Sequence, residues 1–307
     1  MSGPLNFADR LQAAVERTGT PCIVGLDPHL ELLPPEFEAA RDPGLERGQR
    51  AQCLGDFVCE VMRLVAGRVP AVKPQSAFFE ALGSDGARAW ERVVAEARAA
   101  GLLVIGDVKR GDIQSSAAAY SQAFLGTAGL GDARFACDAI TINPLLGADS
   151  VEPFLAHCRE NGSGLFVLVR TSNPSSADFQ RHGEPELSHV IAAAVDRWGE
   201  ELIGSSGLAS VGAVVGATHS RELQDFRARM PRTPILLPGY GAQGGGAGDI
   251  VDAFLPGRGA RGALVSSSRG ILFAWREGRR RGFTWQQATL DALDRMIAAV
   301  GEALARR

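Results

Sequence analysis

The sequence predicts an α/β protein of the (β/α)8 barrel class, the TIM barrel, formed as a single domain over residues 1–307. Eight short apolar runs recur along the chain, and helical patterns lie between them. Most of these runs are continuously apolar, which is typical of parallel strands buried on both faces. Strands that alternate with helices over this length favour a closed parallel barrel over an open sheet.

The eight runs predict strands because they are short and rich in apolar and β-branched residues. In chain order they cover residues 21–26, 69–72, 102–106, 139–142, 165–169, 211–215, 235–237 and 263–265.

Helices are predicted where apolar residues recur at helical spacing and so form one buried stripe. The clearest stripes lie in residues 49–67, in residues 85–100 and in the last segment, from Leu290 to Leu304. Three connections, residues 28–48, 126–136 and 172–188, are longer than a barrel needs. Loops of this length usually carry function or mobility.

Composition and charge exclude several classes of protein. The chain is 45% hydrophobic with a mean hydropathy near zero, an ordinary globular composition. A net charge of -3 and a pI of about 6.0 argue against nucleic acid as a partner. No apolar run is long enough to span a membrane, and the N-terminus lacks a signal-peptide pattern. We therefore expect a cytoplasmic protein with no membrane partner.

The cysteines and histidines do not form a recognisable site. The five cysteines are odd in number and irregularly spaced, and none form a C-x-x-C pair. This pattern predicts a reducing compartment, without a disulfide framework or a zinc site. The histidines do not cluster, so no metal ligands are predicted.

The most informative stretch is G-D-V-K-R-G-D-I at residues 106–113, directly after the third apolar run. Side chains alternate along a strand, so Asp107 and Lys109 are expected on the same face. Asp112 lies past the expected strand end, in the turn. Acids and a lysine in alternation are costly to assemble for structure alone, because burying charges offsets their attraction.

Polar residues also follow other predicted strands, at the end where barrel enzymes place their sites. They are Asp27 after the first strand, Lys73 after the second, Asn143 after the fourth, and Thr171 and Ser172 after the fifth. Lys73, Asp107, Lys109 and Asp112 can form a chain of alternating sign, in which each lysine stays protonated. The alternative is a buried ion-pair network that only fixes the barrel mouth.

Glycine-rich segments follow the seventh and eighth predicted strands. They are P-G-Y-G-A-Q-G-G at residues 238–245 and S-S-S-R-G at residues 266–270. In barrels these loops commonly bind phosphate through backbone N–H groups. Arg269 can make a paired contact with phosphate oxygens. Two tight turns that need glycine are the alternative interpretation.

Taken together, these motifs resemble the orotidine 5'-phosphate decarboxylase family, in its longer bacterial subgroup. The D-V-K-R-G-D-I run at residues 107–113 resembles the family's D-x-K-x-x-D-I signature. Further resemblance lies in residues 25–28, 73–80, 141–144, 238–245 and 268–269, so it runs from about residue 25 to residue 271.

The resemblance implies roles for the charged residues. Asp107 would crowd the substrate carboxylate, and Lys109 would deliver a proton to C6 of the pyrimidine. Lys73 would bind the ribose and hold Asp107, while Asp27 would bind a ribose hydroxyl. The acid matching Asp112 reaches, in this family, across a dimer interface into the partner's site.

The resemblance also implies the substrate-binding residues. Ile113 and Ser116 would accompany the shared acid, and Thr171 and Ser172 would read the pyrimidine amide edge. Gln243 and Arg269 would grip the phosphate. The remaining implied contacts are Asn143, Pro238 and Ser268.

The implied activity is the cofactor-free conversion of orotidine 5'-monophosphate to uridine 5'-monophosphate and carbon dioxide in de novo pyrimidine biosynthesis, by a homodimer. Two alternatives stay open. One is a magnesium-dependent sugar-phosphate decarboxylase or aldolase of the same barrel superfamily, which insensitivity to chelator would exclude. The other is a non-catalytic nucleotide-phosphate binding barrel, which need not keep the charged residues. Lys73 and its K-P-Q-S block favour the nucleotide reading.

Overall fold

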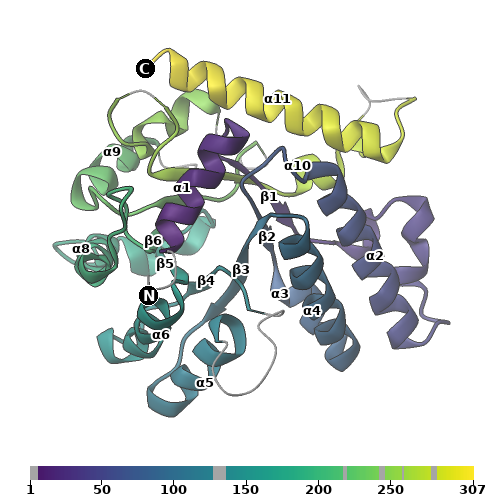
Figure 1. Ribbon diagram of the computed structural model, residues 1–307, viewed down its shortest axis with the longest axis horizontal. Helices are drawn as coiled ribbons and strands as arrows, with labels where there is room; N and C mark the ends of the chain where they lie inside the picture. Colours follow the sequence, from purple (N-terminus) through teal and green to yellow (C-terminus); the bar gives the residue numbers. More distant parts are fainter. Residues whose placement is uncertain (1–5, 127–135, 217–219, 242–245, 258, 278–281) are drawn as a thin grey trace.

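The computed structural model is a closed barrel of eight parallel strands, with helices packed around it (Figure 1). It describes residues 6–126, 136–216, 220–241, 246–257, 259–277 and 282–307. The strands pair in chain order, and β8 pairs with β1 to close the barrel. They are β1 Cys22–Leu26, β2 Ala71–Pro74, β3 Leu103–Arg110, β4 Ala139–Ile142, β5 Gly164–Arg170, β6 Val211–Val215, β7 Ile235–Leu237 and β8 Ala263–Ser267. The predicted fold class is confirmed.

Each predicted strand has a counterpart, but several boundaries differ. The third and eighth strands run further than predicted, to Arg110 and Ser267. Asp107 and Lys109 therefore lie within β3 and do not follow it. Their backbone can stay in the sheet because their side chains reach the polar mouth of the barrel.

The predicted helical segments 49–67, 85–100 and 290–304 are confirmed as α2, α4 and α11, although the first two helices end one or two residues earlier than predicted, at Val65 and Ala99. The α-helices are α1 Phe7–Thr18, α2 Arg47–Val65, α3 Ser76–Glu80, α4 Gly83–Ala99, α5 Gln114–Leu125, α6 Ala148–Asn161, α7 Ala177–Gln180, α8 Leu187–Gly199, α9 Ser220–Arg229, α10 Arg269–Leu272 and α11 Trp285–Ala305. Two of the long connections, residues 28–48 and 172–188, contain short helical turns, Leu30–Leu32, Pro35–Arg41 and Pro174–Ser176, whereas residues 127–135 of the third lie outside the described residues. Among the described residues, no helix is both long and apolar enough to cross a bilayer.

The strands bury both faces, as their continuously apolar sequences predict. On the outer face, Val24, Val72 and Val104 join a cluster with the surrounding helices. On the inner face, Ile23 and Ile105 join a second cluster inside the barrel. Parallel strands covered on both sides are the usual arrangement in this class.

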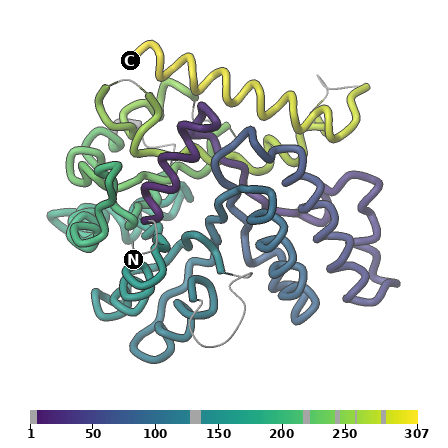
Figure 2. Tube along the Cα trace, viewed as in Figure 1, coloured from purple at the N-terminus to yellow at the C-terminus, as the bar shows by residue number. Residues whose placement is uncertain are grey.

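Helix α1 closes the N-terminal end of the barrel, an arrangement not predicted from the sequence. Its side chains Phe7, Leu11 and Val15 pack into the inner cluster, and the chain trace shows the helix crossing the barrel (Figure 2). The Phe7 ring packs edge-on against Phe166 with centroids 6.1 Å apart. A Cβ atom on Gly164 would lie 2.1 Å from the Phe7 ring, so glycine is required there. The C-terminal ends of the strands are not covered by this helix.

Candidate active site

Strand β3 bulges where it carries the charged residues. Gly106 pairs with Ile140 of β4, and Arg110 pairs with Ile142. Residues 107–109 therefore lie opposite the single residue Thr141 of β4. Lys109 has a φ of 46°, which is uncommon for a residue other than glycine. Bulges are often found beside active sites, where they re-aim side chains.

Asp107 lies at the centre of a charge array formed with two lysines. Its Oδ2 atom is 2.5 Å from Nζ of Lys73, and its Oδ1 atom is 2.5 Å from Nζ of Lys109. The Thr141 hydroxyl donates a hydrogen bond of 2.9 Å to the same Oδ1 atom. The side chains of Lys73 and Asp107 are only 7% and 10% exposed. The array therefore holds a buried carboxylate between the buried Lys73 ammonium and that of Lys109, whose side chain is 44% exposed.

The array keeps both buried partners charged. Burial alone would raise the pKa of Asp107, but attraction to Lys73 and Lys109 outweighs burial and holds that pKa well below its usual range. Burial alone would likewise lower the pKa of Lys73, but the Asp107 and Asp27 carboxylates raise it above its ordinary value. Asp107 is thus an anion, and Lys73 a cation, at neutral pH.

A cavity of about 400 Å³ opens beside the array, a size typical of small-molecule sites. Residues from six consecutive strands or their ends line it: Lys73, Asp107, Lys109, Thr141, Leu168, Thr171, Ser172, Asn173, Val214, Leu236 and Pro238. Six of these were predicted from the sequence. The array forms a charged wall, and Leu168, Val214 and Leu236 supply apolar surface that suits a flat ring.

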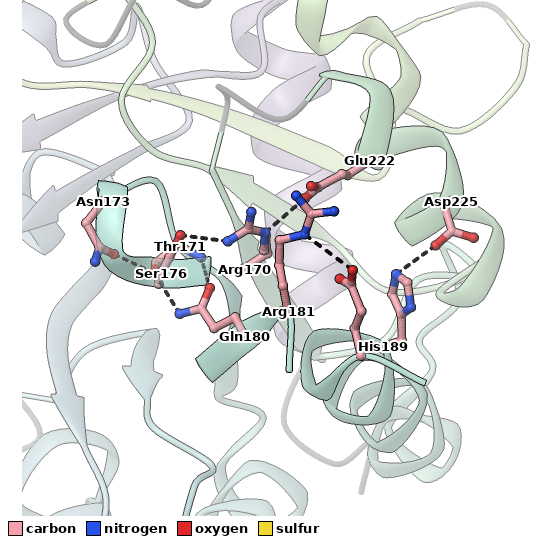
Figure 3. A network of polar contacts seen from close by, with 10 residues as sticks. Arg170, Thr171, Asn173, Ser176, Gln180, Arg181, His189, Glu222 and Asp225 are labelled. Carbon is pink, nitrogen blue, oxygen red and sulfur yellow. Dashed lines mark hydrogen bonds and ion pairs between the residues drawn. The ribbon is translucent and has the colours of Figure 1, made fainter. Parts of the chain in front are cut away.

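The wall formed by the end of β5 is held by its own polar network (Figure 3). The side-chain oxygen of Gln180 accepts a 2.8 Å hydrogen bond from the Thr171 N–H, and its amide nitrogen donates one of 2.8 Å to the Thr171 hydroxyl. Buried Arg170 donates to Glu222 of α9 at 2.9 Å and to the Ser176 hydroxyl at 2.6 Å (Figure 3). These bonds fix the backbone that carries the cavity-lining Thr171.

Two buried oxygens at the C-terminal ends of β1 and β8 have no hydrogen-bond partner among the described residues. They are Oδ1 of Asp27, after β1, and Oγ of Ser268, after β8. Buried polar atoms are nearly always paired, so these two suit a polar ligand. Arg269 is exposed at the start of α10. Gln243 lies outside the described residues.

Seven of the described residues predicted for the site do not line this cavity: Asp27, Asp112, Ile113, Ser116, Asn143, Ser268 and Arg269. The Asp112 carboxylate accepts a 2.7 Å hydrogen bond from the Ile113 N–H, and among the described residues it forms no ion pair with Lys73 or Lys109, which both pair with Asp107. Ile113 is 45% exposed, and Ser116 is exposed on α5. The side-chain oxygen of Asn143 accepts from the Leu145 N–H at 3.1 Å. Within one described chain the array therefore has three members, and the role of Asp112 stays a prediction.

Sequence reasoning missed five of the cavity residues. Thr141 stood in the block at residues 141–144 but was assigned no role. Asn173 directly follows the predicted Ser172. Leu168, Val214 and Leu236 lie in predicted strands, but which apolar residues face the cavity depends on a register that the sequence does not reveal.

A barrel with fixed charges at its mouth belongs to the class of (β/α)8 enzymes that act on small polar ligands at the C-terminal ends of their strands. The family model described as "Orotidine 5'-phosphate decarboxylase / HUMPS family" matches residues 20–277. This chain belongs to that family.

Individual relatives agree with the family match. The chain is 45% identical over 294 residues to a Deinococcus radiodurans protein named orotidine 5'-phosphate decarboxylase, covering 94% of this chain and 97% of the relative. A Rhodopirellula baltica protein of the same name is 44% identical over 275 residues, covering 88% and 89%. The structure of Leishmania donovani OMP decarboxylase matches with a TM-score of 0.73 at 27% identity, over 98% of this chain and 100% of that one. The resemblance found in the sequence is confirmed.

Proposed function

We propose that this chain decarboxylates orotidine 5'-monophosphate to uridine 5'-monophosphate, using its charge array and no cofactor. The observation that carries the proposal is Asp107, held ionised between Lys73 and Lys109 in the wall of the cavity. Family membership and the names of the relatives support this substrate.

In the proposed reaction, fixed charged side chains stabilise the developing carbanion, and no cofactor accepts its electron pair. The bond between C6 and the carboxylate carbon breaks, its electron pair stays on C6, and carbon dioxide leaves as a neutral molecule. The Lys109 ammonium gives its proton to C6 and later regains one from water. A preorganised cation at the developing carbanion is the kind of electrostatic stabilisation that catalyses such steps.

Asp107 contributes by repelling the substrate carboxylate. Two carboxylates about 4 Å apart repel by roughly 4 kcal/mol at an effective dielectric constant near 20. Departure of neutral carbon dioxide removes that repulsion. If all of it were relieved in the transition state, the rate would rise by about a thousandfold.

The remaining contacts are assigned to the parts of the nucleotide. Asp27 and Lys73 bind the ribose, and the unpaired Asp27 oxygen suits a hydroxyl donor. Thr171 and Ser172 read the pyrimidine amide edge from the β5 wall. Arg269 grips the phosphate. Gln243 and Ser268 complete the phosphate site, with Asn143 and Pro238 as further contacts.

We also propose that the active form is a homodimer, each chain a single barrel domain, with shared sites. Asp112, Ile113 and Ser116 would reach the partner's cavity, which agrees with their position outside the cavity of their own chain. Leu145 and Leu146 are 71% and 54% exposed on the loop after β4 and supply apolar surface for a partner. An active monomer at high dilution in sedimentation would contradict the shared role of Asp112.

We place the protein in the cytoplasm. Its five cysteines are unpaired, which suits a reducing compartment. Four of them are buried, and burial raises the pKa of the Cys22 thiol to about 12, so it stays an unreactive thiol.

The deciding experiment follows the ultraviolet absorbance of orotidine 5'-monophosphate mixed with purified protein and excess chelator. Conversion to uridine 5'-monophosphate supports both the reaction and its independence from metal. Activity on sugar phosphates that needs added magnesium, without nucleotide turnover, would instead favour the aldolase branch of the superfamily. Nucleotide binding without turnover would favour the non-catalytic barrel.

A further inference from the structure

The hydroxyl of Thr141 joins the two central members of the array. Its Oγ1 atom accepts a 3.0 Å hydrogen bond from the backbone N–H of Lys109 and donates one of 2.9 Å to Oδ1 of Asp107. Thr141 is 2% exposed and lines the cavity. One buried atom therefore contacts both the proposed proton donor, through its backbone, and the proposed repelling carboxylate.

This contact lies where the β3–β4 ladder is interrupted. The bulge sets residues 107–109 of β3 against Thr141 alone, so the regular ladder offers Lys109 no carbonyl there. A buried backbone N–H without a partner is costly, and the Thr141 hydroxyl supplies one. Lys109 also holds a φ of 46°, a conformation that persists only when its surroundings enforce it.

The two hydrogen bonds of the Thr141 hydroxyl depend on each other, because one uses its proton and the other its lone pair. A hydroxyl has one proton to donate, and Asp107 is ionised and can only accept. The proton therefore points to Asp107, and a lone pair is left for the Lys109 N–H. The same Oδ1 atom also accepts from Nζ of Lys109. Rotation of the Asp107 carboxylate would disturb both contacts together.

We propose that Thr141 is a positioning residue for the decarboxylation, because its hydroxyl fixes the Asp107 carboxylate and the Lys109 backbone relative to each other. The inference rests on the function proposed above and adds a residue to it. Thr141 acts through Asp107 and Lys109, so its loss should affect the chemical step more than nucleotide binding.

The test compares Thr141→Val, which keeps the shape and removes the hydroxyl, with Thr141→Ser, which keeps the hydroxyl. Hydrogen bonds to charged groups and small misplacements of reacting groups each affect rates by about 10- to 100-fold. We expect Thr141→Val to lower kcat by about 10- to 100-fold, with KM and uridine 5'-monophosphate affinity within about threefold of wild type. Thr141→Ser should recover kcat to within about threefold.

The matched control is Thr289→Val on α11. Thr289 is fully buried, and its hydroxyl has no hydrogen-bond partner among the described residues. It should keep wild-type kcat, which separates loss of a buried hydroxyl in general from loss of this one. If Thr141→Val does not fold, Thr141→Ala compared with Thr141→Ser makes the same test.

Three results would overturn the inference: unchanged kcat in Thr141→Val, equal loss of kcat in the valine and serine variants, or a parallel loss of nucleotide affinity. The last would mean that Thr141 serves binding or general stability. Inactive wild-type protein in the same assay would instead count against the proposed function, so the two failures are distinguishable.

Discussion

Replacing Asp107 by asparagine probes the charge array directly, because it removes one charge and almost no volume. Lys73 and Lys109 each lie 2.5 Å from this carboxylate. At the observed 2.5 Å, two opposite charges attract by roughly 7 kcal/mol at an effective dielectric constant near 20, and the cost of desolvating them offsets part of this attraction. In the variant, the buried Lys73 ammonium loses its ion-pair partner and keeps only the weaker attraction of the Asp27 carboxylate. Removing one partner of a buried pair typically costs about 3–5 kcal/mol, and we expect the free energy of unfolding to fall by that amount.

The assay is urea unfolding near neutral pH, with Glu302→Gln as the control. Glu302, in the last turn of α11, forms an exposed ion pair with Arg306 at 3.1 Å, just past the end of the helix, and such pairs contribute less than about 1 kcal/mol. Adding Lys73→Met to Asp107→Asn removes the stranded charge and should recover most of the lost stability. The reasoning is refuted if Asp107→Asn costs no more than the control, or if the double variant is less stable than the single one.

Four further outcomes are expected. Lys109→Ala should abolish turnover yet still bind uridine 5'-monophosphate, because the proposed phosphate contacts follow β7 and β8 and not β3; near-normal steady-state turnover would contradict its proposed role as proton donor. The folded-state pKa of Asp107 lies below its unfolded value, so its contribution to stability is present above about pH 4 and is lost as the pH falls toward the folded pKa. Acid titration of the unfolding free energy should therefore be steeper for wild type than for Asp107→Asn, and equal slopes would argue against the array. Gly216→Ala should raise KM, since its Cβ would lie 2.9–3.1 Å from atoms of Ser172; an unchanged KM would show that the wall can move. Arg269→Ala should raise KM by about 10- to 100-fold, as loss of a charged hydrogen bond does, and an unchanged KM would remove it from the phosphate site.

The barrel could be predicted because parallel strands covered on both faces must be apolar almost throughout. Apolar runs such as residues 139–142 and 211–215 therefore indicate where strands lie, and these two match β4 and β6 residue for residue. Lys73, Asp107 and Lys109 could be predicted because charges are costly at the ends of buried strands unless they serve a purpose.

The features that could not be predicted depend on contacts between distant segments. The bulge that sets Thr141 against Asp107 and Lys109 is a property of strand pairing, and a single sequence does not reveal that register. The packing of α1 inside the barrel end is equally non-local. Asp112 is a different case, because the role implied for it needs a second chain.

The closed end of the barrel has a practical consequence for attaching this protein to a surface. Helix α1 seals the end where the strands begin, and the cavity opens where they finish. A tether joined ahead of α1 would emerge on the side away from the cavity. In immobilised molecules the cavity would then face the solution, and substrate would reach the cavity without crossing the support.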